Sequence, residues 1–93
     1  MKSKYTVIPT NQFKKDLKAA KKRNLNMDQI ESVIISLAEG KVLESKHKDH
    51  ALKGNYIGYR ECHISPDWLL VYKIQDDILI LTLSRTGSHS DLF

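Results

Sequence analysis

The sequence predicts an α+β fold in which two N-terminal helices pack on one face of an antiparallel sheet, in the order β-α-α-β-β-β. Two segments in the first half of the chain carry apolar residues at helical spacing, and three short β-rich segments separated by turn residues occupy the second half. The chain has 93 residues, so we expect one domain, residues 1–93, with a single modest core.

A proline separates the first strand from the first helix. Residues 5–8 are rich in β-forming residues, and Pro9 ends that run. Thr10 or Asn11 supplies a capping side chain for the helix that follows, and Asn24 ends this helix. Lysines lie on one side of the helix, and its apolar side carries Phe13, Leu17 and Ala20.

The second helix has a recognisable signal at each end. Asn26 caps its start, with Gln29 three residues later in a capping-box arrangement, and Gly40 follows its last turn as a C-cap glycine. A small domain needs the apolar stripe of this helix for its core. The stripe consists of Met27, Ile30, Val33, Ile34, Leu37 and Ala38.

The second half of the chain predicts a three-stranded meander after a polar loop at residues 44–50. The strands are expected at residues 59–64, 68–74 and 78–83, with turns at 65–67 and 75–77. The third strand is apolar on both faces and is therefore expected inside the sheet. Arg85 leaves this strand, Gly87 breaks its path, and residues 88–93 form a loop or one helical turn.

Alternation along residues 59–64 assigns side chains to the two faces of the sheet. Tyr59, Glu61 and His63 point to one face, whereas Arg60, Cys62 and Ile64 point to the other. Cys62 and His63 are adjacent but cannot form a nucleophile–base pair, so we interpret Cys62 as a small buried residue. The helices cover one face, and the other face is left free for a site.

The net charge of +4 is concentrated near the N-terminal end. Residues 1–48 carry eleven Lys and Arg against five Asp and Glu, whereas residues 49–93 carry four against six. Asp16 is the only acidic residue within the basic run, which consists of Lys14, Lys15, Lys18, Lys21, Lys22 and Arg23. Such a run is either a solvated helix face or a docking surface for RNA phosphates.

Cysteine content and hydropathy favour a cytoplasmic protein without a membrane segment. A single cysteine permits no internal disulfide, which suits a reducing compartment. The apolar run near the start is too short for a signal peptide, and no segment could span a membrane.

Residues 48–93 collect the types of side chain that an enzyme needs to cut RNA without a metal. Imidazoles move protons near neutral pH, guanidinium groups hold phosphates, and aromatic rings stack on bases. His63 and Asp67 flank the same turn and are expected to come close across it. The histidine spacings match no common metal motif, so we predict no metal and no cofactor.

An ordered set of motifs in this region resembles the YafQ branch of the RelE superfamily, the toxins of bacterial type II toxin–antitoxin systems. The matching residues are Lys48-Asp49-His50, Leu52, Gly54, Gly58-Tyr59-Arg60, His63, Pro66-Asp67-Trp68, Tyr72-Lys73, Arg85-Thr86-Gly87, His89 and Leu92-Phe93. The specific match covers about half of the chain, and the predicted RelE-like element order extends it over the whole length.

The resemblance implies a ribosome-dependent mRNA endonuclease that cuts the codon in the 30S A site by attack of the messenger's own 2′-hydroxyl. The implied catalytic residues are His50, His63, Asp67, Arg85 and His89, with His89 as general acid. The implied substrate-binding residues are Trp68, Phe93, Lys53 and Arg60, although Trp68 has a structural or positioning role as its alternative.

The resemblance also implies partners. These are mRNA, the ribosome and a cognate DinJ-like antitoxin, a small DNA-binding dimer whose tail folds on the toxin. Two rival functions share the fold or the charge pattern. One is a ParE-like inhibitor of DNA gyrase, and the other is a non-catalytic RNA-binding module. The number of proton-transfer groups argues against the gyrase inhibitor. The RNA-binding module predicts RNA binding that survives loss of the histidines, without cleavage.

Overall fold

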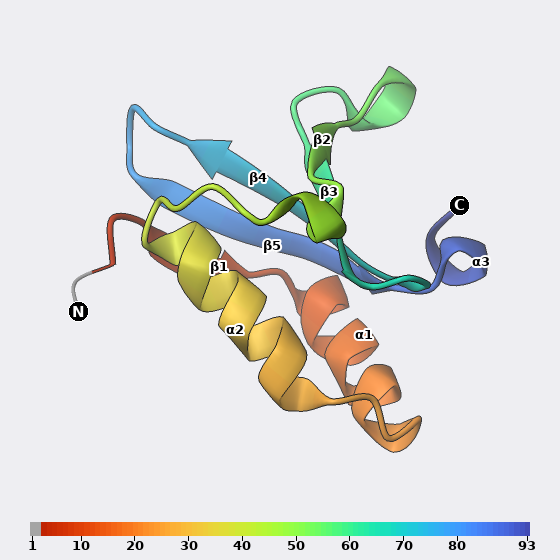
Figure 1. Cartoon of the computed structure of the whole chain (residues 1–93). Coiled ribbons are helices and arrows are strands. Elements are labelled where there is room, and N and C mark those ends of the chain that lie inside the picture. Colours follow the sequence, from red (N-terminus) through yellow and green to blue (C-terminus); the bar gives the residue numbers. More distant parts are fainter. Residues whose placement is uncertain (1–2) are drawn as a thin grey trace.

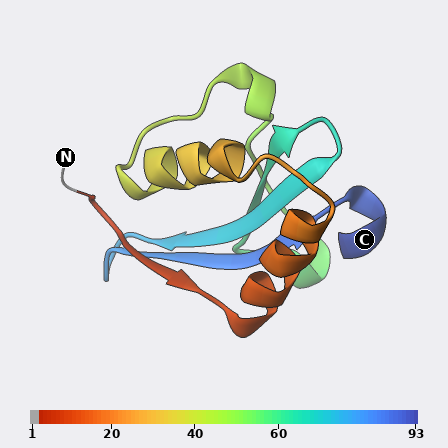
Figure 2. The same cartoon turned by 90° about the horizontal axis from the view of Figure 1, so that it is seen from below.

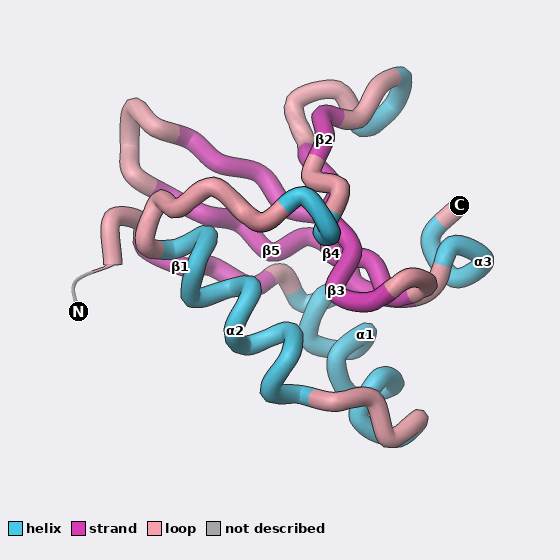
Figure 3. Tube along the Cα trace, in the orientation of Figure 1, coloured by secondary structure: helices cyan, strands magenta, loops and turns pink. Residues whose placement is uncertain are grey.

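The computed structural model describes residues 3–93, and its elements follow the predicted order with short additions (Figures 1 and 3). In chain order these elements are β1 (Thr6–Pro9), α1 (Asn11–Lys22), α2 (Met27–Ala38), the 3-10 turn η1 (Ser45–His47), β2 (His50–Ala51), the 3-10 turn η2 (Gly54–Tyr56), β3 (Arg60–Ser65), β4 (Trp68–Gln75), β5 (Ile80–Gly87) and α3 (His89–Leu92).

The strands form one mixed sheet in the order β1-β5-β4-β3-β2. Strands β2 to β5 pair antiparallel, whereas β1 runs parallel to β5, with Thr6 opposite Ile80. The predicted α+β fold is therefore confirmed, with one difference in strand direction. A long helical connection leaves the direction of β1 open in the sequence, because only tight turns force neighbouring strands to be antiparallel.

The two long helices begin and end at the predicted signals. The Thr10 hydroxyl accepts the Phe13 N–H at 3.0 Å at the start of α1. The Asn26 side chain accepts the N–H of Asp28, rather than that of Gln29, at 2.9 Å at the start of α2. Gly40 follows α2 with φ at 78°, which only glycine adopts without strain. No helix within residues 3–93 is long and apolar enough to cross a membrane.

The main core lies between the two long helices and one face of the sheet (Figures 1 and 2). Both helices turn their apolar stripes toward the strands, as the helical spacing predicts. The buried residues of the main core are Tyr5, Phe13, Ala20, Ile30, Val33, Leu37, Ala38, Cys62, Ile64, Trp68, Leu70, Tyr72, Leu81 and Leu83.

The opposite face of the sheet is only partly free. A second, smaller cluster there contains Leu69, Val71 and Leu92, and the partly buried side chains of Leu52, Tyr56 and Tyr59 pack against it. The segment 52–59 and α3 thus cover part of this face, on the side away from the long helices (Figure 1). The sequence predicted that this face would be free, and this prediction is wrong for the covered part. Burial of apolar side chains on the second face adds to the stability of the domain.

The last strand begins and ends later than expected. Residues 76–79 form the turn before β5, with Ile78 exposed and Leu79 at a φ of 55°. Apolar composition alone had suggested strand for these two residues. At the other end, Arg85 stays within β5, which continues to Gly87. The polar loop at 44–50 likewise contains η1 and the start of β2, which were not expected.

Candidate active site

The sheet register brings predicted catalytic residues to the face opposite α1 and α2. His50 lies opposite Glu61 across β2 and β3. Glu61 lies opposite Val71 on β4, and Val71 lies opposite Arg85 on β5. Directly opposed residues share a face of the sheet, so His50, Glu61 and Arg85 occupy one row across four strands. Three inter-strand spacings separate the ends of this row by about 14 Å.

A second row runs beside the first. His63 lies opposite Leu69, and Leu69 lies opposite Gly87, the last residue of β5. The helix α3 begins directly afterwards with His89, and the rings of His63 and His89 have centroids 5.6 Å apart. The two rows therefore collect three histidines, a carboxylate and an arginine on one surface.

Glu61 lies between two of the histidines and was not among the predicted site residues. Its Oε1 is 3.6 Å from Nε2 of His50 and 4.0 Å from Nε2 of His63, and its side chain is only 8% exposed. The sequence does contain a signal for Glu61. It lies two residues before His63 on the same strand, so the two side chains share a face of the sheet. A buried carboxylate facing two imidazoles is a candidate for proton transfer rather than for packing.

The hydrogen bonds of His50 and His63 fix which ring nitrogen carries the hydrogen. Nδ1 of His50 lies 2.7 Å from the Lys48 carbonyl, and Nδ1 of His63 lies 3.2 Å from the Pro66 carbonyl. A carbonyl oxygen can only accept, so each Nδ1 carries the hydrogen. In the neutral state Nε2 then has a free lone pair, and in the charged state it carries a transferable proton.

Asp67 pairs with His89 rather than with His63. Its Oδ1 accepts from Nδ1 of His89 at 2.8 Å and from the His89 backbone N–H at 3.2 Å. These hydrogen bonds, the side-chain one first, hold the pKa of Asp67 below its usual value. The expected contact between His63 and Asp67 is thus corrected, because α3 folds back over the turn and supplies the nearer imidazole.

The short helix α3 is held from two sides. Ser88 and Asp91 form a reciprocal capping box at its start. Arg23, the residue that follows α1, donates to Asp91 with Nη1 at 2.8 Å from Oδ2. Hydrogen bonds from Arg23 and Ser88 hold the pKa of the Asp91 carboxyl well below its usual range. A Cβ at Gly87 would lie 3.0 Å from that of Asp91, so this close return of the chain favours glycine.

Phe93 follows α3 on the same surface and remains available to a ligand. Its ring meets Tyr56 edge to face with centroids 5.6 Å apart, and the residue is 59% exposed. Offset and edge-on aromatic contacts of this kind fix ring orientation. The position of Phe93 is therefore compatible with its predicted contact to a nucleotide base.

Trp68 has a different position from the one that its predicted substrate role requires. The residue is 2% exposed in the main core, and its Nε1 donates to the Thr86 hydroxyl at 2.9 Å. A ring enclosed on both faces cannot stack on a base, so the assignment of Trp68 to substrate binding is corrected to the structural alternative. Alternation explains the result, because Trp68 shares a face with Leu70 and Tyr72.

Arg60 is also removed from the histidine surface. It lies on the helix side of β3, where its Nε donates to Asp49 at 3.3 Å, and the Tyr72 hydroxyl donates to the same oxygen at 2.5 Å. The two bonds anchor the carboxylate of Asp49, the residue before β2. Arg60 therefore supports the start of β2 from the helix side of the sheet. Lys53, by contrast, is exposed in the segment between β2 and η2.

Cys62 is enclosed on the same side as Arg60, as its parity predicts. The side chain is 0% exposed, and burial raises the pKa of its thiol to about 12. A buried thiol of this kind carries no thiolate near neutral pH and has no path to a substrate. The interpretation of Cys62 as a packing residue is therefore confirmed.

The basic run on α1 forms a largely exposed charged side of that helix. Lys14, Lys15, Lys18, Lys21 and Lys22 are all exposed. Within residues 3–93, no carboxylate lies within ion-pair distance of these five side chains. Arg23 differs from them, since its guanidinium is engaged by Asp91 on α3.

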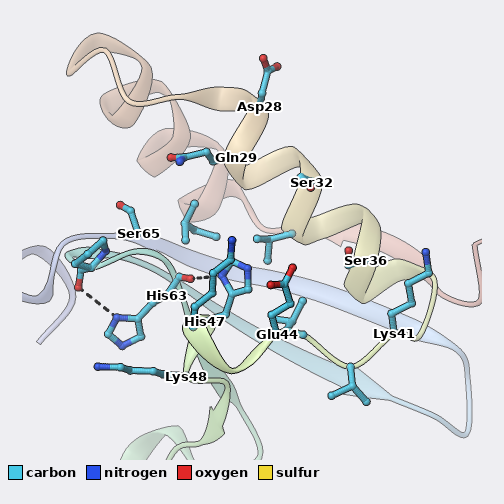
Figure 4. Close-up of a pocket in the computed structure, with 16 residues that line it drawn as sticks. Asp28, Gln29, Ser32, Ser36, Lys41, Glu44, His47, Lys48, His63 and Ser65 are labelled. Atoms are coloured by element: carbon cyan, nitrogen blue, oxygen red, sulfur yellow. Dashed lines mark hydrogen bonds between the residues drawn. The ribbon is translucent and has the colours of Figure 1, made fainter.

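A hollow of the described surface lies between α2, the segment 41–48 and the end of β3, where His63 lines it (Figure 4). It measures about 820 Å³ and is lined by polar side chains of α2, such as Ser32, and by His47 and Lys48. His47 donates from Nδ1 to the His63 carbonyl at 2.6 Å, which ties η1 to the edge of β3 (Figure 4). Of the three histidines on the sheet surface, His63 lines this hollow, whereas His50 and His89 do not.

One group on the histidine surface has the spacing of metal ligands. Glu61, His63 and His89 each offer one ligand atom, and these atoms lie within 4.8 Å of one another. The sequence did not suggest this group, because its members come from β3 and α3 rather than from one motif. Imidazole and carboxylate are both ordinary ligands of transition metals.

Comparisons with known proteins identify the family of the chain. Residues 5–93 match the family described as "Bacterial toxin of type II toxin-antitoxin system, YafQ". The mRNA interferase toxin YafQ of Escherichia coli strain K12 is 39% identical over 85 residues, which are 90% of each chain. The E. coli DinJ-YafQ toxin-antitoxin complex contains a chain with a TM-score of 0.89 and 36% identity, over 97% of this chain and 98% of that one.

A metal-bound toxin from Helicobacter pylori has a TM-score of 0.90 and 43% identity, over 96% of this chain and 99% of the other. Sequence and structure thus match those of these relatives over nearly the whole length of the chain. The chain belongs to the YafQ family of bacterial toxins of type II toxin–antitoxin systems.

Proposed function

We propose that this protein is an mRNA interferase, an endoribonuclease that cuts mRNA in the A site of the ribosome. One observation carries the proposal. Imidazoles with a free Nε2, a carboxylate and an arginine lie on the same face of the sheet, and every imidazole is held through Nδ1. The family relationship supports it, since the related E. coli protein is named an mRNA interferase toxin.

The proposed reaction is a transesterification within the message. The 2′-oxygen attacks the adjacent phosphorus while the bond from phosphorus to the 5′-oxygen breaks. The products are a 2′,3′-cyclic phosphate and a free 5′-hydroxyl. One proton must leave the 2′-hydroxyl, and another must reach the 5′-oxygen. DNA lacks the attacking hydroxyl and is expected to be inert.

The site geometry suggests how these protons move. The pair of His50 and His63 facing Glu61 supplies the base, since their free Nε2 atoms and the carboxylate can take up the first proton. His89 supplies the second proton from Nε2, with Asp67 on its Nδ1. Arg85, in the row of Glu61, stabilises the charge that develops on the phosphate.

The proposed site differs from the predicted one by one added residue and two removed residues. Glu61 is added to His50, His63, Asp67, Arg85 and His89. Phe93 and Lys53 stay as substrate-binding residues, whereas Trp68 and Arg60 support the fold.

The proposed partner outside the ribosome is a DinJ-like antitoxin. One solved structure of an E. coli relative is a DinJ-YafQ toxin-antitoxin complex. Antitoxins of this kind typically carry a segment that folds when it binds. An acidic segment would complement the exposed lysines of α1.

The test is cleavage of a defined message with and without programmed ribosomes, using antitoxin-free protein. We expect ribosome-dependent cuts within the A-site codon, with 2′,3′-cyclic phosphate ends. EDTA at a concentration that leaves ribosomes intact should not prevent cutting. Loss of cutting in EDTA, restored by a transition metal, would instead give the group of Glu61, His63 and His89 a role as metal ligands. Absence of cutting, combined with inhibition of gyrase supercoiling, would favour the ParE-like alternative.

Reversal of charge on α1 tests the docking surface. The triple variant Lys14→Glu, Lys18→Glu, Lys22→Glu should bind ribosomes more weakly, because phosphate contacts are lost. It should also lower the salt slope of binding by roughly one unit per lost contact. The matched control is Lys14→Arg, Lys18→Arg, Lys22→Arg, which keeps the charges and should bind normally. Unchanged ribosome affinity and salt slope in the Glu variant would leave the lysines as a solvated helix face.

A further inference from the structure

The strand β5 is covered by β1 along only part of its length. Pairing between the two strands ends where Pro9 lies opposite Leu83. Beyond that point α1 lies beside β5. Its N-cap residue Thr10 donates from its hydroxyl to the Ser84 carbonyl at 2.9 Å. One turn and a half later, the Asp16 carboxylate accepts the backbone N–H of Thr86 at 3.2 Å. Asp16 therefore stands at the open edge of β5, beside the proposed catalytic arginine.

The carboxylate of Asp16 holds the Arg85 guanidinium as a two-point fork. Nε of Arg85 is 2.8 Å from Oδ2, and Nη2 is 3.2 Å from Oδ1. Gln12 donates to Oδ1 at 3.0 Å, so each carboxylate oxygen accepts two hydrogen bonds. Paired parallel bonds of this kind fix the plane of the guanidinium as well as its position.

The fork leaves the outer side of Arg85 available. A guanidinium has five N–H donors, and Asp16 takes two of them. The remaining three are enough for a bidentate contact with a phosphate. Since the Arg85 side chain is 29% exposed and the Asp16 side chain only 10%, the arginine is reachable while its anchor is shielded.

The charge of Asp16 is unusual for its surroundings. It is the only acidic residue in a helix that is otherwise basic, and four of the lysines lie within five positions of it. Burial alone would raise the pKa of its carboxyl, but the hydrogen bonds from Arg85, Gln12 and Thr86 outweigh burial and lower that pKa. Asp16 therefore stays ionised at neutral pH, and the stability that it contributes is lost only as the pH falls through its lowered pKa.

We infer that Asp16 is a positioning residue for RNA cleavage, which orients the guanidinium of Arg85 toward the scissile phosphate. The inference rests on the proposed function and deepens it, because Asp16 itself lies behind Arg85 and does not touch substrate. The competing explanation is that the ion pair only fastens α1 to the sheet. That explanation predicts that loss of the Asp16 carboxylate lowers stability, and that it slows cleavage equally whether or not Arg85 is present.

A double-mutant cycle on Asp16 and Arg85 separates the two explanations. Single-turnover cleavage on programmed ribosomes is measured for Asp16→Asn, Arg85→Ala and the double variant, and thermal unfolding is measured for each. Misplacement of a catalytic group by about 1 Å costs roughly 100-fold, so Asp16→Asn is expected to slow the chemical step by about 10- to 100-fold. In the Arg85→Ala background the same change should cost nothing further. Glu31→Gln, which removes one exposed carboxylate from α2, is the matched control and should cleave normally.

Three outcomes overturn the inference. Equal losses from Asp16→Asn with and without Arg85 would show a purely structural role. Normal cleavage by folded Asp16→Asn would show that Arg85 needs no anchor, and faster cleavage would show that the carboxylate competes with the phosphate. If Asp16→Asn does not fold, the cycle is run with Asp16→Glu, which keeps the charge but shifts the fork, under the same criteria. An inactive wild type would contradict the proposed function instead.

Discussion

Replacement of His89 by alanine is expected to slow mRNA cleavage by about 10²–10⁴-fold and to leave the protein folded. The Nδ1 hydrogen of His89 is held by Asp67, so Nε2 is the atom that can deliver a proton to the leaving 5′-oxygen. The His89 side chain is 55% exposed, so its removal takes little from the core. The measurement is single-turnover cleavage of a defined message on programmed ribosomes, with ribosome binding recorded in parallel.

The pH dependence of the same variant gives an independent check. A general acid acts in its protonated form, so the wild-type rate should fall on the alkaline side as the acid loses its proton. His89→Ala should lack that alkaline limb and keep the acidic limb, which reports the base. Near-normal cleavage by folded His89→Ala would falsify the assignment of the general acid.

Replacement of Trp68 by alanine is expected to lower the free energy of unfolding by about 3–5 kcal/mol, since a large buried aromatic side chain leaves a cavity. The total free energy of unfolding of a native protein is about 5–15 kcal/mol, so the variant should be close to unfolding. Its cleavage per folded molecule should match the wild type, because the ring is enclosed in the core and cannot reach RNA. Urea unfolding and cleavage at low temperature measure the two quantities.

Trp68→Phe is the matched variant. Phenylalanine keeps an aromatic ring in the core but lacks the N–H that donates to Thr86. Trp68→Phe should therefore lower the free energy of unfolding by less than Trp68→Ala does. That hydrogen bond contributes about 1 kcal/mol. If Trp68 were a stacking platform, RNA binding by Trp68→Ala would weaken by about 1–3 kcal/mol while its stability stayed near that of the wild type. That combination is the result that would restore the substrate role.

Local patterns in the sequence were sufficient for most of the fold. Capping by Thr10 and Asn26 and the left-handed glycine at position 40 marked the helices, because these signals act within one turn of the chain. Alternation along β3 placed Cys62 in the core and His63 on the other face, because the strand period is two. The direction of β1 and the late start of β5 depend on contacts distant in sequence and could not be predicted.

The candidate site divides in the same way. The histidines and Arg85 carry recognisable chemistry, so residue type and family resemblance found them. Glu61 and Asp16 are ordinary carboxylates until cross-strand register and the packing of α1 place them beside His50 and Arg85. The pairing of Asp67 with His89 depends on how α3 folds back, and the burial of Trp68 depends on which face of β4 the helices cover.

The position of Cys62 has a practical consequence for fluorescence experiments. It is the only thiol of the chain, it is 0% exposed, and its pKa is raised to about 12, so maleimide dyes should leave it unmodified in the folded protein. The native sequence can therefore serve as a background for attaching one dye at an introduced cysteine. Val42 is 96% exposed and lies in the segment beside α2, so Val42→Cys offers an accessible position for that dye.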